Sequence, residues 1–289
     1  MWTGCRHPVT HNPRILVLGA SGRLGAILQR HWCDTEIHPI WQFRADPVAP
    51  SPSGEYLVFD PLVGPPAHTP VDIVLGLAGI VPGKGALSRN TDLALATVRC
   101  AHALGARNVM LSSSAAVYGV SEHPHCEDVP ASPLSAYGTA KLEMEIQALA
   151  LAQHYGIEAT ALRIGNVAGA DALLGQSGSS RILDQFDSGQ GPVRSYIGPI
   201  GLSTVLQALT RKAWSGAPLP KHLNIALKGG VAMDDLCQAA GLDVTWQPAP
   251  ETAVEKVVLD VTRLAGLVPV PEARAMAVVA DWHADRDKQ

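Results

Sequence analysis

The sequence contains no cluster of basic residues. Its 289 residues include 22 lysines and arginines against 26 aspartates and glutamates, which gives a net charge of -4. Proteins that bind the phosphate backbone of DNA or RNA usually carry a basic patch or stripe. We therefore expect no nucleic-acid partner.

Closely spaced cysteines and long hydrophobic runs are absent as well. The longest apolar run, residues 73–82, is shorter than the roughly 20 residues that span a bilayer. The first 13 residues lack the apolar core of a signal peptide, and we assign residues 1–12 as a leader without function. We expect no membrane partner and a cytoplasmic location. No C-x-x-C pair occurs, so we expect reduced thiols and no bound metal; the cysteines are Cys5, Cys33, Cys100, Cys126 and Cys237.

What the sequence does contain is a glycine-rich segment after a short apolar run. Residues 15–18 predict a buried strand, and the apolar side chains of residues 24–28 have helical spacing. Gly19 permits a tight turn, Gly22 lets the backbone approach a pyrophosphate, and Gly25 lets the helix pack on the strand. The helix N-terminus offers free N–H groups to phosphates, so we predict a dinucleotide site here. Its expected cofactor-binding residues are Gly19, Ser21, Gly22, Arg23, Leu24 and Gly25.

Strand and helix patterns alternate along the chain. Strands are expected at residues 15–18, 37–43, 56–59, 71–77, 108–111 and 158–162, with helices at 90–104 and from 137 onward. This order predicts an α/β fold with a doubly wound parallel (Rossmann) sheet that binds ligands at the carboxyl ends of its strands. We expect residues 13–168, completed by 197–228, to form the dinucleotide-binding domain. Residues 169–196 and 229–289 would form a small C-terminal substrate lobe.

The adenosine ribose of the cofactor should meet the residue that ends the second strand. An acidic residue there would bind the ribose hydroxyls and favour NAD. This chain has Arg44, which with help from Arg23 would pair with a 2′-phosphate and favour NADP. In the alternative, Asp46 binds the ribose and Arg44 is a surface residue. We predict NADP as cofactor, with NAD as the alternative.

Three further strand ends contribute to the expected cofactor site. Asp60 closes the third strand, and Leu77, Ala78 and Gly79 end the fourth. Small residues there allow a backbone to lie against a cofactor, although ordinary turn chemistry explains them equally well. Ser112 begins a run of three serines after the fifth strand, where ligands of such a sheet bind.

Tyr137 and Lys141 lie four residues apart on an expected helix. One helical turn brings the ammonium near the phenol, and a nearby positive charge lowers the pKa of a tyrosine from about 10. The tyrosine then becomes usable as a general acid and base. The same spacing is common in surface pairs, so the serines and glycines upstream are what favour the catalytic interpretation.

Together these motifs resemble the extended short-chain dehydrogenases/reductases, which include NAD-dependent epimerases and dehydratases. The resemblance rests on the glycine segment, the serine run, the tyrosine and lysine pair, and residues 162–169. It implies that Ser114 hydrogen-bonds the reacting oxygen of the substrate and that Tyr137 transfers the proton. Lys141 would bind the nicotinamide ribose and lower the pKa of Tyr137. Ser113 is a further expected substrate contact, and it takes the role of Ser114 if the register of the serine run is shifted by one residue.

By the same resemblance, the segment after the sixth strand closes over the nicotinamide. Ile164 would contact the cofactor and Asn166 the diphosphate of the substrate, while a turn residue is the alternative for Asn166. Arg181 or Arg194 would clamp a phosphate from the glycine- and serine-rich region that follows. A flexible linker explains that region as well.

The chain departs from the family pattern after residue 197. Family members usually have isoleucine, histidine, valine and two aspartates there, whereas residues 200–204 of this chain contain no acidic residue. The departure leaves the catalytic residues in place and weakens inferences about substrate contacts. The small lobe predicts a compact substrate or one held only in part.

The resemblance implies an enzyme that moves a hydride between a nicotinamide cofactor and a carbonyl or hydroxyl carbon of a sugar, foremost a nucleotide sugar. An NADP preference favours a reductase, and the serine run favours an epimerase. A dehydratase is disfavoured because Ala115 and Ala116 stand where that branch carries an acidic pair. The alternative is an inactive cofactor-sensing or scaffold protein of the same fold. We expect a homodimer through helices 90–104 and 137–154, unless their apolar residues all face the sheet.

Overall fold

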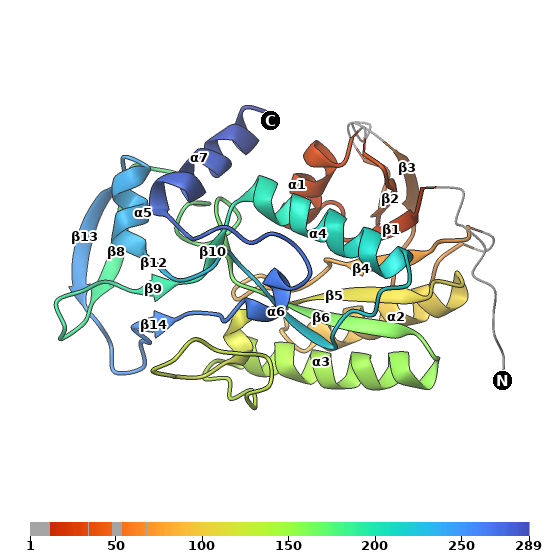
Figure 1. Ribbon diagram of the computed structural model, residues 1–289, viewed down its shortest axis with the longest axis horizontal. Helices are drawn as coiled ribbons and strands as arrows, with labels where there is room; N and C mark the ends of the chain where they lie inside the picture. The colour runs from red at the N-terminus through yellow and green to blue at the C-terminus, as the bar shows by residue number, and fades with distance from the viewer. Residues whose placement is uncertain (1–11, 34, 48–53, 67–68, 289) are drawn as a thin grey trace.

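The computed structural model describes residues 12–33, 35–47, 54–66 and 69–288 (Figure 1). The expected leader, residues 1–12, lies outside these ranges except for Asn12. Within them, no helix is long and apolar enough to cross a membrane.

A seven-stranded parallel sheet with the order β11-β6-β5-β4-β1-β2-β3 forms the centre of the structure (Figure 1). In that order the strands are His222–Ile225, Glu158–Ile164, Asn108–Ser114, Ile73–Gly76, Arg14–Leu18, His38–Phe43 and Glu55–Val58. The chain runs outward from β1 to β3 on one side and from β4 to β11 on the other. Ligands of such sheets bind at the carboxyl ends of the strands beside this reversal, which is where the glycine segment follows β1. The predicted doubly wound parallel sheet is confirmed.

The fifth strand is longer than the sequence predicted. Instead of ending at residue 111, β5 continues through Ser114, because β6 extends beside it and pairs residues 162–164 with residues 112–114. Successive side chains of a strand point to opposite faces. The three serines therefore do not share one environment.

Helices cover both faces of the sheet (Figure 1). Helices α1 (Arg23–His31) and α4 (Pro199–Trp214) cover one face, and α2 (Arg89–Ala103) and α3 (Ala136–His154) cover the other. Along β1, residues 15 and 17 pack in the core beneath α1 and α4, and residues 16 and 18 pack beneath α2 and α3. The apolar run of β1 is thus explained by burial on both faces.

Most of the remaining short elements form a lobe beside the sheet, at the left of Figure 1, whereas residues 115–117 and 262–265 pack against α3 and β11 of the sheet layer. The lobe has a third apolar core, which includes Leu173, Leu183, Tyr196 and Leu236. The boundaries of the two expected domains stay a prediction. The elements outside the main sheet layer are η1 (Ala115–Val117), β7 (Asn166–Val167), β8 (Ser180–Gln185), β9 (Val193–Arg194), β10 (Tyr196–Ile197), β12 (Val231–Ala232), α5 (Met233–Ala239), β13 (Asp243–Pro248), β14 (Lys256–Val257), α6 (Thr262–Ala265) and α7 (Ala275–Arg286).

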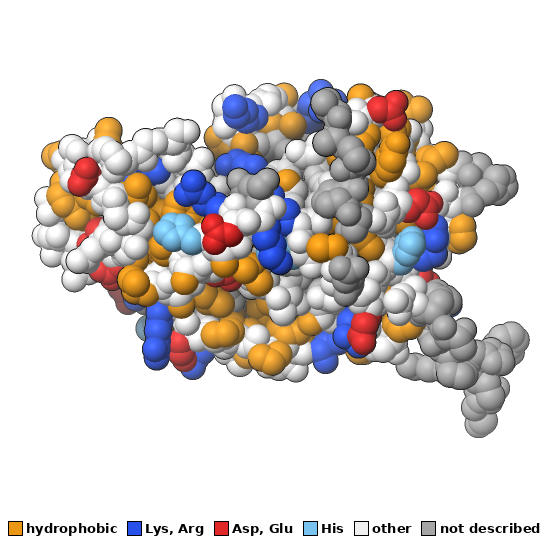
Figure 2. Space-filling view, turned by 90° about the horizontal axis from the view of Figure 1, so that it is seen from above, with side chains coloured by type: hydrophobic (Ala, Val, Ile, Leu, Met, Phe, Trp, Pro, Cys, Tyr) orange, Lys and Arg blue, Asp and Glu red, His pale blue; other side chains and the backbone are white. Residues whose placement is uncertain are grey.

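The C-terminal helix α7 returns from the lobe to the sheet layer. Asp281 accepts hydrogen bonds from the backbone N–H groups of Ile200 at 2.8 Å and Gly201 at 3.0 Å, at the start of α4. A Cβ at Gly198 would lie 2.1 Å from Cγ of Asp281, so the close approach requires glycine. Residues 200–204 lack the acidic residue of the family pattern, and the carboxylate beside them comes from Asp281 of α7 instead. Basic side chains gather near the middle of the face that contains α4 and α7 (Figure 2).

Candidate active site

Ser114 and Tyr137 meet because η1 packs closely against the start of α3. Ser114 Oγ accepts a hydrogen bond from the N–H of Ala116 at 3.2 Å, and Ser135 caps α3 by accepting one from the N–H of Gly138 at 3.1 Å. A Cβ at Gly138 would lie 2.0 Å from the carbonyl oxygen of Ala116. Glycine at 138 thus permits the approach that joins Ser114 and Tyr137 in a hydrogen bond.

Burial raises the pKa of Tyr137 above its ordinary value of 10.0, although its hydrogen bond with Ser114 and the positive charge of Arg23 act in the opposite direction. Lys141 is not among the groups that act on this pKa here, so its predicted lowering of the pKa stays a prediction. The ammonium of Lys141 lies 5.9 Å from the centroid of the Tyr137 ring and donates to the carbonyl oxygen of Ser112 at 2.9 Å. Burial of Tyr137 thus favours the neutral phenol, and Ser114 and Arg23 favour the phenolate.

Lys141 is 3% exposed. Burial lowers its pKa from 10.5 to about 8, while the carboxylate of Glu145 raises it. A Cβ at Gly79 would lie 3.2 Å from Nζ, so the residues after β4 pass close to the ammonium. Lys141 thus lies between two strand ends for which the sequence predicted cofactor contacts, Ser112 and Gly79.

Glu145 is a charged residue near the site that the sequence analysis missed. Its carboxylate is 1% exposed and forms a bidentate ion pair with Arg163, whose Nη2 lies 2.8 Å from Oε2. Arg163 Nη1 also donates to the hydroxyl of Tyr118 at 3.0 Å, and that hydroxyl donates to Asn224 at 2.9 Å. The spacing of four residues between Lys141 and Glu145 is the signal that would have found it.

Ser113 is turned away from Ser114. Its hydroxyl is buried and donates to Oε1 of Glu145 at 2.5 Å, on the opposite face of β5. The geometry therefore gives no support to Ser113 as a substrate contact and favours Ser114 as the serine beside Tyr137.

The glycine segment forms a close cradle at the carboxyl end of β1. Gly19 has a φ of +85°, and a Cβ on it would lie 2.6 Å from the backbone nitrogen of Ala78. A Cβ on Gly25 would lie 2.5 Å from the carbonyl oxygen of Ala20. No side chain of the described residues caps the N-terminus of α1, so its N–H groups can bind an anion. These residues fit the pyrophosphate of a dinucleotide.

At the predicted ribose end, Gln42 joins β2 to the glycine segment. Its amide accepts a hydrogen bond from the N–H of Gly19 at 3.1 Å and donates to the carbonyl oxygen of Phe59 at 2.6 Å. Arg44 and Asp46 are both exposed, and neither forms an ion pair with another described residue. Asp60 caps its own turn by accepting from the N–H of Leu62 at 3.0 Å. The choice between Arg44 and Asp46 stays a prediction.

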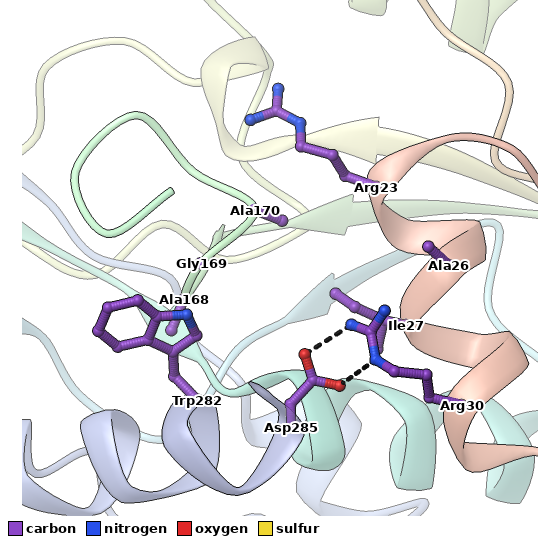
Figure 3. A pocket seen from close by; sticks show the side chains of 9 residues that line it. All are labelled: Arg23, Ala26, Ile27, Arg30, Ala168, Gly169, Ala170, Trp282 and Asp285. Atoms are coloured by element: carbon purple, nitrogen blue, oxygen red, sulfur yellow. Dashed lines mark hydrogen bonds and ion pairs between the residues drawn. The ribbon is translucent and has the colours of Figure 1, made fainter. Parts of the chain in front are cut away.

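Arg23 begins α1 and lines a cavity of about 160 Å³ between α1, residues 168–170 and α7 (Figure 3). The base of this cavity is fixed by Asp285, which is 2% exposed and accepts from Arg30 at 2.9 and 2.6 Å. Arg23 points away from that pair, and its charge acts on Tyr137. In the sheet, β2 and the following Arg44 lie on the opposite side of β1 from β4 and β5. The help that Arg23 would give Arg44 at a 2′-phosphate stays a prediction.

Asn166 lies where the chain enters the lobe, and its side chain hydrogen-bonds Tyr196. The hydroxyl of Tyr196 also donates to Asp171 at 2.8 Å. Asn166 is half-buried, at the edge between sheet and lobe. Its predicted contact with a diphosphate stays a prediction.

Neither lobe arginine is arranged as the predicted phosphate clamp. Arg181 is 4% exposed, and its guanidinium donates to carbonyl oxygens of the loop that carries it, those of Leu173, Gln176, Gly178 and Ser180. Arg194 donates to the carbonyl oxygens of Val193, Val254 and Glu255. Both arginines order the backbone because its polar groups need partners in a lobe with little regular structure. The described residues contain no group of three or more His, Cys, Asp or Glu side chains suited to a metal ion.

Comparison with solved structures shows the same fold. The UDP-glucose 4-epimerase from Brucella ovis in complex with NAD aligns with a TM-score of 0.76 and 18% identity over 92% of this chain and 96% of that one. A UDP-galactose 4-epimerase aligns with a TM-score of 0.73 and 21% identity over 94% of this chain and 99% of that one.

Comparison of sequences gives relatives over part of the chain. The UDP-glucose 4-epimerase of Azospirillum brasilense is 30% identical over 176 residues, which is 55% of this chain and 51% of the relative. That of Corynebacterium glutamicum is 38% identical over 89 residues, 30% of this chain and 27% of the relative. The chain thus matches about half or less of the length of these relatives. The model of the NAD dependent epimerase/dehydratase family matches residues 15–193, more than half of the chain, and the protein belongs to that family.

Proposed function

We propose that the protein is a nucleotide-sugar epimerase that uses a nicotinamide cofactor. The observation that carries the proposal is the hydrogen bond between Ser114 and Tyr137, formed beside a buried Lys141 and next to the glycine cradle. Family membership and the UDP-sugar epimerases among its relatives support the substrate class.

In the proposed mechanism, Ser114 and Tyr137 act on one sugar oxygen. Ser114 orients that oxygen, and Tyr137 gives or takes its proton at the phenolic hydroxyl. When bound, the cofactor supplies the acceptor and donor of a hydride. In the first half-reaction a sugar hydroxyl is oxidised, so Tyr137 must accept its proton as the phenolate, and it returns that proton when the ketone is reduced. Burial raises the pKa of Tyr137, whereas Ser114 and the positive charge of Arg23 lower it toward the phenolate that this step needs. Lys141 would bind the nicotinamide ribose of the cofactor.

Replacing Tyr137 with phenylalanine tests the mechanism. Turnover of UDP-glucose should fall by about 10²–10⁴-fold, since general acid–base catalysis typically contributes that much. The affinity for the nicotinamide cofactor should stay within about twofold, because the ring and its packing remain. Tyr155→Phe is the control, since the ring of Tyr155 stacks on that of His102, with 4.1 Å between the ring centroids, and takes no part in the site. Unchanged turnover in Tyr137→Phe would remove Tyr137 from the mechanism. A wild-type protein that binds cofactor but turns over no sugar would favour the inactive sensing protein.

We also propose that Arg44 gives the site a preference for NADP. The motivating observation is an exposed arginine directly after β2, a strand that contains no Asp or Glu to bind the ribose hydroxyls. Titration calorimetry with NADPH and NADH should show tighter NADPH binding in the wild type and loss of the difference in Arg44→Gln. A preference for NADH, weakened in Asp46→Asn, would instead assign the ribose to Asp46 and NAD as cofactor. NADP preference would make a sugar reductase the second candidate function.

A homodimer is proposed through α2 and α3. These helices pack together and leave a groove lined by residues of both, including Thr91, Leu95, Ala140 and Glu143. Ile146 of α3 is 58% exposed, an apolar side chain that a second copy would cover. Analytical ultracentrifugation of the wild type and Ile146→Glu checks this, and a monomeric wild type would contradict it.

A further inference from the structure

The guanidinium of Arg23 forms no hydrogen bond with a described residue, and its charge acts on Tyr137 of the predicted reaction site. It is the first residue of α1, it is exposed, and it forms no ion pair with a described residue. Its guanidinium extends from α1 toward the side of the cavity where Ala170 lies, away from the pair of Arg30 and Asp285 (Figure 3). Its positive charge also lowers the pKa of Tyr137. The guanidinium is thus near both the substrate lobe and the acid/base residue.

Opposite Arg23, the cavity is bounded by residues 168–170, which pack tightly against α7. Gly169 has a φ of +79°, and a Cβ on it would lie 2.3 Å from Nε1 of Trp282. Trp282 belongs to α7, which is fixed to the sheet layer through Asp281 and Asp285. The backbone at 168–170 therefore stays close to the glycine segment, and a group bound between them contacts Arg23 and the lobe together.

Most basic side chains of the lobe have partners, although Lys256 and Arg274 are exposed and form no ion pair with a described residue. Arg181 and Arg194 are committed to backbone carbonyls. Lys228 pairs with Glu272 at 2.7 Å, and Arg263 pairs with Asp128 at 2.7 Å. A diphosphate that enters between lobe and sheet needs a charged donor with unused hydrogens, and arginine suits it because its planar fork binds two oxygens at once.

We propose that Arg23 binds the diphosphate of the nucleotide sugar from the cofactor side of the cleft, in the role that the sequence suggested for the lobe arginines. This inference rests on the proposed nucleotide-sugar substrate. The backbone N–H groups of the glycine segment remain available for the cofactor pyrophosphate, so the two anions use different donors of the same turn. The bound diphosphate would lie next to Tyr137 and fix the sugar against it.

The test is titration calorimetry with UDP and with uridine for the wild type, Arg23→Gln and Arg23→Lys, each saturated with whichever of NAD and NADP the wild type binds more tightly. Arg89→Gln is the matched control, because Arg89 is likewise an exposed first residue of a helix. Loss of a charge-assisted bidentate contact should weaken UDP binding by about tenfold or more in Arg23→Gln and less in Arg23→Lys. Uridine affinity, cofactor affinity and the melting temperature should match those of Arg89→Gln.

Equal UDP affinity in the wild type and Arg23→Gln would overturn the proposal while leaving the proposed function intact. A loss of cofactor affinity with unchanged UDP affinity would also overturn it and assign Arg23 to the cofactor. A wild type that binds neither UDP nor uridine would overturn the nucleotide-sugar proposal and this inference together. The titrations of the wild type alone reveal that result, before any variant is measured.

Discussion

Replacing Glu145 with glutamine removes one negative charge from the buried network behind the site. The carboxylate is 1% exposed and the Arg163 side chain 4% exposed, and their bidentate contact includes a distance of 2.8 Å. Removing one partner of a buried ion pair costs about 3–5 kcal/mol. Glutamine keeps an oxygen that accepts from Ser113 or Arg163, so we expect a loss of about 3 kcal/mol. For a domain of this size, that lowers the melting temperature by about 6–12 °C.

The same substitution should change the pH dependence of turnover. The Glu145 carboxylate raises the pKa of Lys141, which burial has lowered to about 8. Without it, and with Arg163 left uncompensated, the pKa of Lys141 falls further. Lys141 is protonated below its pKa and neutral above it, so it loses its charge at a lower pH in the variant. The alkaline limb of kcat should therefore begin above about pH 8 in the wild type and at lower pH in Glu145→Gln.

The measurements are kcat from pH 6 to 10 and thermal unfolding of the same preparations. Glu122→Gln is the control, because Glu122 is an exposed carboxylate on a loop outside α2 and α3, and it should change stability by less than about 0.5 kcal/mol. A lower melting temperature with an unchanged alkaline limb would refute the reasoning, since Glu145 would then support the fold without setting the charge of Lys141.

The remaining predictions concern α7. Gly169→Ala should lower the free energy of unfolding, because its φ is +79° and the new Cβ would lie 2.3 Å from Nε1 of Trp282 in α7. Gly189→Ala is the control, since Gly189 has a similar φ of +78° in open space, and it should lose about 1–2 kcal/mol. Urea unfolding should show a further loss of about 1–3 kcal/mol in Gly169→Ala. Equal losses would mean that Trp282 moves aside freely. Asp281→Ala leaves two N–H groups of α4 without their acceptor and should lower the free energy of unfolding by about 1–2 kcal/mol. Asp287→Asn, at the exposed end of the same helix, should leave it within about 0.5 kcal/mol; a similar loss in both variants would contradict the cap.

Much of the sheet followed from local patterns. Apolar runs and glycine spacing depend on neighbours within a few residues, and they predicted the strands, the α1 turn and the parallel order. The end of β5 was wrong by three residues because it depends on β6, whose pairing lies about 50 residues away along the chain. Extended backbone continues there because a partner strand satisfies its hydrogen bonds.

For the candidate site, the sequence determined which residue types were available, and the tertiary structure decided their partners. The sequence placed Ser114, Tyr137 and Lys141 in motifs, since their spacing on strand and helix is a local property. Which face of β5 meets Tyr137, and that Glu145 lies behind it, depends on how α3 packs across the sheet.

The arginines show the limit of the sequence most clearly. A glycine-rich lobe segment made Arg181 an expected ligand, and the residue after β2 made Arg23 an expected helper of Arg44. In the fold, Arg181 satisfies the carbonyls of its own loop, whereas Arg23 faces Tyr137. The sequence by itself determined the sheet, the dinucleotide turn and the inventory of charged groups. Only the tertiary structure decided where long side chains point, because their direction depends on which backbone groups and charges from distant segments surround them.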